Sequence, residues 1–240
     1  MVPTPPPFIL TAVCALTYSF EIVFGLAGTI LMLAVLTLFY DAKALVIYSV
    51  LPQILVGTIG LARSPRTVRA GFLGGMLAFA TLGGGAGFFL FYHVPGNVFR
   101  VLLATLITLA GLHLLVGPRH LHLHAAGGRA LDTLAGLSQA LFGISGPIAM
   151  TRLLATFSDK TTVRNYALAF FLALNVLRAT GYLFAHTITP EIGRLMLDSG
   201  PFLAVTLWFS NHLHFRVNET MFRRVVAWII FASGLSMFLR

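Results

Sequence analysis

Two glycine-rich segments are the first candidates for chemistry in this sequence, because each interrupts a long apolar run. They are residues 25–29 (GLAGT) and 143–147 (GISGP), and glycine at such places lets the chain reverse. A helix that begins at the turn directs unpaired N–H groups and the positive end of its dipole toward it, which suits a bound anion. Close helix packing by small residues is the alternative reading. The expected anion contacts are Gly25, Gly28, Thr29, Ser145 as N-cap, Gly146 and Pro147 in the first helical turn.

Polar side chains inside the apolar runs are the next candidates. Asn175 and Arg178 are three residues apart and therefore share a helix face. A charge in the middle of a membrane helix costs about 3 kcal/mol or more, so Arg178 should face the protein interior. We expect it to bind an anion, or else to pair with a neighbouring carbonyl or carboxylate. Arg152, six residues after Gly146, is expected in the same cavity or at its cytoplasmic rim.

Glu21 and Gln139 hold matched places, each just before one of the glycine turns. Glu21 is an acid well inside an apolar run, where a carboxyl group tends to take up a proton because the charged form is poorly solvated. It is expected either to bind and release a proton as part of the function or to act as a neutral structural acid. Gln53 is a further candidate for the cavity.

Other polar motifs indicate no cofactor or metal. His120, His122 and His124 alternate in one short segment, but no carboxylate or cysteine completes a site and the spacing is not that of a zinc helix. A single cysteine, Cys14, excludes internal disulfides. Residues 83–87 (GGGAG) lie inside an apolar run and indicate close helix packing.

The composition places these residues in a bilayer. Of the 240 residues, 58% are hydrophobic and 10% charged, against roughly 45–50% and 25% in soluble domains. A soluble enzyme and a disordered chain are therefore excluded. The net charge of +9 comes mostly from basic residues at the ends of apolar runs, where they mark topology. Nucleic acid is not an expected partner; the lipid bilayer is.

The two halves of the chain resemble each other. A shift of 118 residues superimposes the two glycine turns, and the same shift places Asp41 on Asp159 and Tyr48 on Tyr166. A duplication explains this pattern. The expected first repeat, residues 1–117, has a hairpin at about 8–40 and spans at about 44–62, 70–92 and 98–117; a His-rich cytoplasmic linker follows at 118–129; the second repeat, 130–240, has a hairpin at about 133–157 and spans at about 166–186, 197–213 and 225–239.

Loop charges predict how the halves are oriented. Arg66 and Arg129 mark cytoplasmic loops on either side of two spans. If residues 133–157 crossed the membrane fully, Arg164 and Arg216 would lie outside, against the positive-inside rule. A hairpin that enters and returns restores the rule, and one hairpin plus three spans inverts the second copy. We therefore predict an all-α integral membrane protein of two inverted repeats, each a re-entrant broken helix plus three transmembrane helices, with both termini outside.

The paired motifs resemble those of the sulfite exporter TauE/SafE family, also called toluene sulfonate uptake permeases. The resemblance rests on the two glycine turns and on Phe99-Arg100 with Gly111-Leu112, which recur as Phe222-Arg223 with Gly234-Leu235. It covers nearly the whole chain, although the first turn departs from the family pattern at Ala27 and Thr29. It implies a transporter of small sulfur-containing anions such as sulfite, sulfonates or sulfoacetate, often outward.

The expected function is therefore that of an inner-membrane anion carrier working by alternating access, not an enzyme. Its expected partner is a small anionic substrate, with proton coupling and a homodimer left open. Two alternatives stay open at this point. One is a carrier or channel for another small ion, and the other is a metal-dependent membrane enzyme that uses the three histidines.

Overall fold

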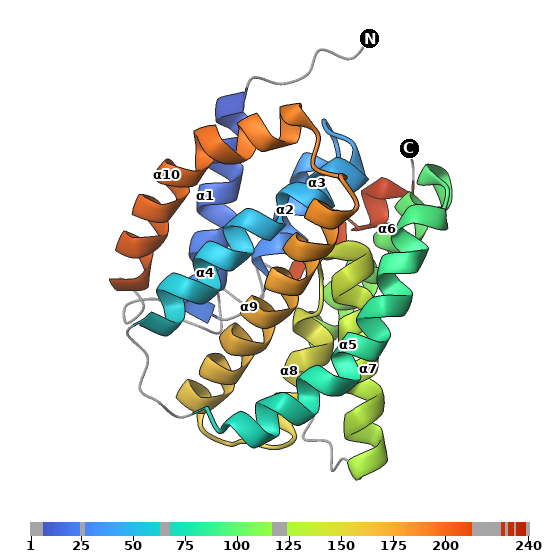
Figure 1. The fold of residues 1–240 in the computed structure, drawn as a ribbon, viewed down its shortest axis with the longest axis vertical. Coiled ribbons are helices and arrows are strands. Elements are labelled where there is room, and N and C mark those ends of the chain that lie inside the picture. Colours follow the sequence, from blue (N-terminus) through green and yellow to red (C-terminus); the bar gives the residue numbers. More distant parts are fainter. Residues whose placement is uncertain are drawn as a thin grey trace.

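All secondary-structure elements in the part of the chain that the computed structural model describes are helices (Figure 1). That part comprises residues 7–24, 27–62, 68–116, 124–212, 227–228, 230–232 and 234–238. Within it lie ten assigned helices: α1 (Pro7–Phe24), α2 (Gly28–Leu36), α3 (Ala42–Tyr48), α4 (Val50–Ala62), α5 (Ala70–His93), α6 (Gly96–Val116), α7 (Ala125–Phe142), α8 (Gly146–Leu154), α9 (Lys160–Phe184) and α10 (Pro190–His212).

Four helical stretches among the described residues are long and apolar enough to cross a membrane. They are 42–62, 70–93, 96–113 and 161–184, and they cover four of the six predicted spans. The predicted span at 197–213 falls in α10, which is helical but outside this set and contains Pro201. The last predicted span, 225–239, lies only partly within the described residues.

Each region predicted to form a hairpin contains a long helix followed by a short one. α1 and α7 have 18 residues each, and α2 and α8 have nine each. α1 starts 118 positions before α7, and α2 starts 118 positions before α8. The helix boundaries therefore repeat at the spacing found in the sequence. Asp41 and Asp159, which are also 118 apart, are the N-caps of α3 and α9.

Side-chain contacts show that the second helix of each hairpin returns along the first. The Tyr18 hydroxyl of α1 lies 3.1 Å from the Thr29 hydroxyl and donates to the Met32 sulfur at 3.7 Å. In the second hairpin, Arg152 of α8 lies 3.6 Å from Asp132 of α7. α7 begins at Ala125, earlier than the predicted hairpin start at 133, and therefore includes the buried Asp132 that pairs with Arg152.

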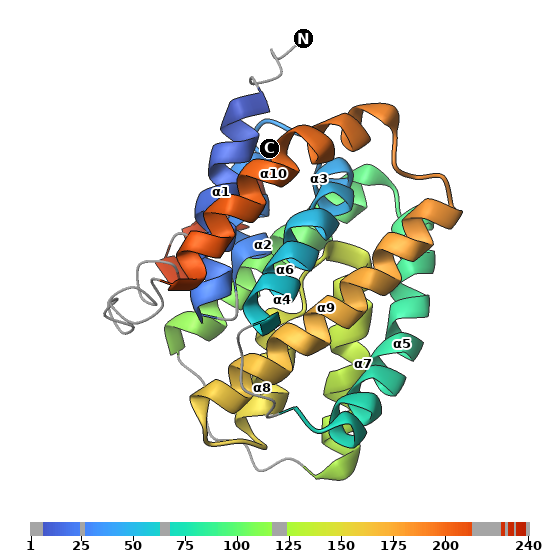
Figure 2. The same cartoon turned by 60° about the vertical axis from the view of Figure 1, so that its left-hand side comes forward.

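The two halves are interleaved rather than side by side. Figures 1 and 2 show α1 with α10 at one side, α5 with α7 at the opposite side, and α4 with α9 between them. Each of these three pairs joins a helix of the first half to one of the second. Because the pairs cross between halves, the two hairpins are held against a common centre.

The α5–α7 contact is a close approach of two backbones, as the glycine run predicted. A Cβ at Gly83 would overlap the Thr133 carbonyl oxygen, one at Gly87 the Leu137 carbonyl oxygen, and one at Gly136 that of Ala80. Gly85 faces open space. Two members of the 83–87 run therefore serve close helix packing, which is what small residues do in membrane proteins.

Large apolar side chains are exposed on the outer surface of the bundle. They include Leu82, Phe89, Leu109, Phe184 and Trp208. Such a surface is unfavourable in water and suits hydrocarbon. The interior, in contrast, holds several buried polar groups, among them Glu21, Gln53, Gln139, Asn175 and Arg178.

Candidate functional site

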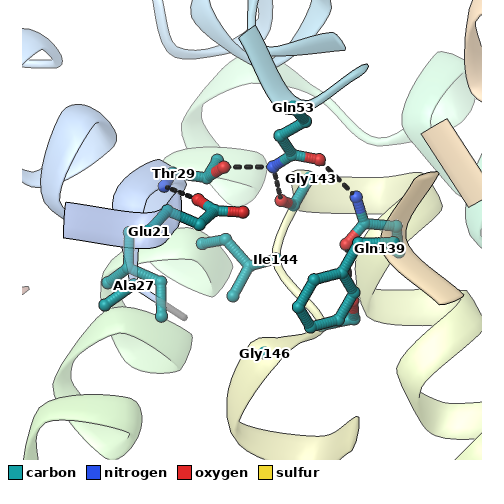
Figure 3. Close-up of a pocket in the computed structure, with 11 residues that line it drawn as sticks. Glu21, Ala27, Thr29, Gln53, Gln139, Gly143, Ile144 and Gly146 are labelled. Atoms are coloured by element: carbon teal, nitrogen blue, oxygen red, sulfur yellow. Dashed lines mark hydrogen bonds between the residues drawn. The ribbon is translucent and has the colours of Figure 1, made fainter. Parts of the chain in front are cut away.

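The two hairpin turns meet at one small cavity near the centre of the bundle (Figure 3). The cavity volume that the centre of a water molecule can occupy is about 20 Å³, which is room for about one water molecule. The cavity therefore brings together two turns that are more than a hundred residues apart in sequence. Its walls are Glu21, Ala27, Thr29 and Ile30 of the first hairpin, Gln139, Gly143, Ile144, Ser145 and Gly146 of the second, Gln53 of α4 and Phe171 of α9.

Gln53 ties the two turns together. Its amide nitrogen donates to the Thr29 hydroxyl and, at 2.8 Å, to the Gly143 carbonyl. Its amide oxygen accepts a hydrogen bond from the Gln139 amide at 2.8 Å. Figure 3 shows the side chain between the two hairpins. The sequence marked Gln53 only as a further cavity candidate, since an amide inside an apolar run does not indicate how many partners it has.

In the first hairpin, the side chain of Glu21, which belongs to α1, lies at the N-terminus of α2. Its Oε2 accepts the Thr29 backbone N–H at 3.2 Å. A Cβ at Gly28 would overlap this carboxylate, so the carboxylate can approach only because residue 28 is glycine. Ala27 precedes the helix in the left-handed region, with φ 80°, and gives no side-chain cap. The expected anion-binding N–H groups of this turn are therefore engaged by the protein's own carboxylate.

The second hairpin has uncharged chemistry at the same places. Ser145 is at the N-cap position of α8, as predicted, but its side chain makes no capping bond. Its hydroxyl instead donates to the Gln139 amide oxygen at 2.6 Å. Pro147 is in the first turn of α8, and Gly143 ends α7 with φ 72°. The N-terminus of α8 thus lacks a carboxylate like the one that Glu21 places at the N-terminus of α2.

Arg178 lies directly behind the second turn, as a buried cation with neutral partners. Its guanidinium donates to the Asn175 side-chain oxygen at 2.8 Å, the Val46 carbonyl at 2.9 Å and the Tyr182 hydroxyl at 3.3 Å. Its Nε has no hydrogen-bond partner, and only 3% of the residue is exposed. A Cβ at Gly143 would lie 3.2 Å from the guanidinium.

A continuous series of hydrogen bonds joins Arg178 to the cavity. Asn175 accepts from Arg178 and also from the Gln139 amide, at 3.1 Å. Gln139 donates to Gln53, which donates to Thr29, whose N–H is bound by Glu21. The acidic residue Glu21 and the basic residue Arg178 therefore stand at the two ends of a buried set of neutral hydrogen-bonding groups.

Arg152 is placed elsewhere. It pairs with Asp132 at 3.6 Å and donates to the Thr156 hydroxyl at 2.7 Å, with its guanidinium 5.1 Å from the centre of the Phe72 ring. It does not line the cavity. The sequence did not single out Asp132, whose pairing with Arg152 joins the arms of the second hairpin. Gly25, another predicted contact, lies outside the described residues.

Two further basic residues donate hydrogen bonds to carbonyl groups at helix ends. The Arg164 guanidinium donates to the Ile22 carbonyl at 2.7 Å, in the last turn of α1, and to the Asn211 side chain at 3.1 Å. Lys43 donates to the carbonyls of Phe91 and Val94, at 2.8 Å each, at the end of α5. Both cations satisfy carbonyl groups that a helix end leaves unpaired.

The three histidines of the alternative metal site lie mostly outside the described residues. His120 and His122 lie outside the described residues, and His124 is the residue before α7. Among the residues that the structure describes, no group of three His, Cys, Asp or Glu side chains is arranged to hold a metal ion.

Comparison with known proteins identifies the chain. The model of the family described as Sulfite exporter TauE/SafE matches residues 10–237. Searches among curated proteins and solved structures gave no match. The family match covers both hairpins, the cavity between them and all four apolar helical stretches. The chain thus belongs to the Sulfite exporter TauE/SafE family, and it is a multi-pass membrane transporter rather than an enzyme.

Proposed function

We propose that this transporter carries a small sulfur-containing anion, such as sulfite, a sulfonate or sulfoacetate, through the cavity between the two hairpin turns. Family membership supports the substrate class, and the buried Arg178 supports the site. Its guanidinium is surrounded by neutral groups in the described part of the chain and connected through Asn175 to the cavity. Because a buried charge is costly unless it is compensated, an anion would complete this site.

The small cavity supports transport by a moving barrier. A sulfonate group is larger than the roughly one-water space between the turns. Substrate binding therefore requires the two hairpins to separate, which breaks the bridge that Gln53 makes between Thr29 and Gly143. We propose that the described conformation is the closed state of an alternating-access cycle, with both turns in contact through one side chain.

Inverted repeats would give this cycle its two symmetry-related states. The proposal is supported by the repeating helix boundaries and by the pairing of helices. In repeat terms, α7 corresponds to α1 and α5 to α10, so the α5–α7 pair is the counterpart of the α10–α1 pair. With the loop charges, this supports an inner-membrane protein whose residues 118–129 face the cytoplasm and whose termini lie outside. Outward transport of the substrate is supported by the family alone.

Counterflow in proteoliposomes tests the site. Purified protein is reconstituted with unlabelled sulfite or methanesulfonate inside, and uptake of the labelled anion is followed. Arg178→Gln is expected to lower substrate affinity about 30-fold or more, because a buried charge partner is worth about 2 kcal/mol or more. Arg194→Gln removes the same charge from an exposed position on α10 and serves as the matched control.

Two results would contradict the proposal. One is counterflow of sulfur anions by Arg178→Gln at the wild-type affinity, which would remove the guanidinium from the site. The other is uptake or current selective for cations, which would favour the alternative of a carrier or channel for another ion.

A further inference from the structure

The cavity is already lined by a carboxyl group of the protein's own. Glu21 is 5% exposed, lines the cavity and is held by the Thr29 N–H. Among the described residues the one ion pair within 4 Å joins Arg152 to Asp132, so no basic side chain there neutralises Glu21 directly. A substrate anion in the same cavity would lie within a few ångströms of this carboxylate, at a depth where like charges repel strongly.

With a monovalent anion bound, the charges around the site balance only when Glu21 is protonated. Arg178 contributes one positive charge and an ionised Glu21 one negative charge, so the site is neutral before substrate binds. A monovalent anion then leaves it with a net negative charge. If Glu21 carries a proton, the bound anion and Arg178 balance, and the carboxyl group gains an O–H that can donate to the anion.

The other ionisable groups near Glu21 do not replace it in this role. On its own helix, Tyr18 hydrogen-bonds to Thr29. α2 and α4 contain no acidic or basic residue. On α9, Arg178 is in the network described above, and Arg164 binds the carbonyl of Ile22. The acidic, basic and histidine residues of α10, which packs against α1, are all exposed: Glu191, Arg194, Asp198 and His212.

At the matched positions of the two hairpins, only the first has a carboxyl group. The place of Glu21 is taken in the second hairpin by Gln139, whose amide is occupied by Gln53, Asn175 and Ser145. An amide does not take up a proton in this range. The cavity can therefore bind one proton at Glu21 and none at the matching position.

We propose that the anion binds only when Glu21 is protonated, so that the transporter carries one proton with each monovalent anion. This inference rests on the proposed function of the cavity. The proton is taken up with the anion on one side of the membrane and released with it on the other. Transport of a monovalent sulfonate is then electrically neutral, and Gly28 contributes by leaving room for the carboxyl group beside α2.

Binding of methanesulfonate as a function of pH tests the proposal. Sulfonates are strong acids, so this anion keeps its charge and any pH dependence comes from the protein. In calorimetry on the full chain in detergent, wild-type affinity should fall about tenfold per pH unit above the titration of Glu21, with one proton bound per anion. Glu21→Gln, whose amide oxygen can still accept the Thr29 N–H, should bind tightly at every pH and take up no proton.

The controls separate the possible results. Glu191→Gln removes an exposed acid on α10 and should keep the wild-type pH dependence. If Glu21→Gln, folded by its thermal transition, also keeps that dependence, or if the wild type takes up no proton, the coupling role of Glu21 is overturned. If neither protein binds any sulfur anion at any pH, the proposed function fails and this inference fails with it.

Discussion

The helices of the two hairpins have the same lengths, but the first turn holds a carboxyl group and the second holds only uncharged side chains. In the first, a carboxylate from α1 accepts the N–H groups at the start of α2; in the second, Gln139 and Ser145 bind each other and leave the start of α8 uncapped by a side chain. The backbone pattern therefore repeats while the charge does not. Under the two proposals above, the proton binds at the first hairpin, and the uncharged turn of the second hairpin is left for the substrate.

The two turns also differ in backbone conformation at residues that the structure describes. In the first, Ala27 takes the left-handed conformation just before α2. In the second, Gly143 takes it just after α7, where glycine has no steric cost. Ser145, which corresponds to Ala27 in the second hairpin, has φ −128°, so these two matched residues differ in backbone conformation.

The first helices of the hairpins are anchored by different means. α7 packs on α5 through glycines that let the backbones touch. α1 packs on α10 through side chains, including a 2.8 Å hydrogen bond between the hydroxyls of Ser19 and Ser210. The second hairpin is therefore attached to its neighbour by contacts that tolerate no added atoms, whereas side chains at the contacts of the first can adjust.

The largest expected effect comes from breaking the glycine contact of the second hairpin. Gly83→Ala places a methyl group on the Thr133 carbonyl oxygen, and a backbone cannot move aside as a side chain does. We expect a loss of about 3 kcal/mol or more in the free energy of unfolding. Thermal unfolding of the purified protein in detergent measures it.

Gly85→Ala, two residues along α5, is the matched control. It faces open space, and alanine is the better helix former, so we expect stability to be unchanged or slightly higher. Equal transition temperatures for the two variants would show that α5 and α7 are not in backbone contact.

An intermediate effect comes from exchanging the residue types of the two left-handed positions. Gly143→Ala should lower the free energy of unfolding by about 1–2 kcal/mol, since alanine is strained there. Its methyl group would also press on the Arg178 guanidinium, 3.2 Å away, and weaken anion binding. Ala27→Gly relieves the same strain in the first turn and should raise stability by up to about 1 kcal/mol. The comparison fails if chemical denaturation shows both variants destabilised equally.

The sequence predicted the parts of the fold that depend on local chemistry. Glycine runs mark the breaks in both hairpins, and apolar runs mark the helices, because these features act over a few residues. The 118-residue shift correctly paired Asp41 with Asp159, and each proved to be an N-cap. The charge inside α1 likewise marked Glu21 as a cavity residue.

Contacts between distant segments were beyond such reasoning. Gln53 makes its three bonds to groups on both hairpins, and nothing within α4 indicates them. Arg152 is close to the second turn in sequence, yet a nine-residue helix carries it back along α7 to Asp132. The neutral surroundings of Arg178 are likewise a property of the packed bundle.

The smallest expected effect concerns the N-caps that follow the hairpins. Asp41 accepts one hydrogen bond, from the Ala44 N–H at 2.9 Å, whereas Asp159 accepts two from Thr162. The Thr162 hydroxyl, at 2.6 Å, and then its N–H, at 2.8 Å, favour the ionised form and hold the pKa of Asp159 below its usual range. A group whose pKa is lowered on folding adds stability above its unfolded pKa, and this stability is lost as the pH falls through the folded pKa. Asp159→Ala should therefore lower the transition temperature slightly more than Asp41→Ala at neutral pH, and its effect should shrink in acid. A deficit that stays constant from neutral to acid pH would mean that the carboxylate charge does not contribute to the cap.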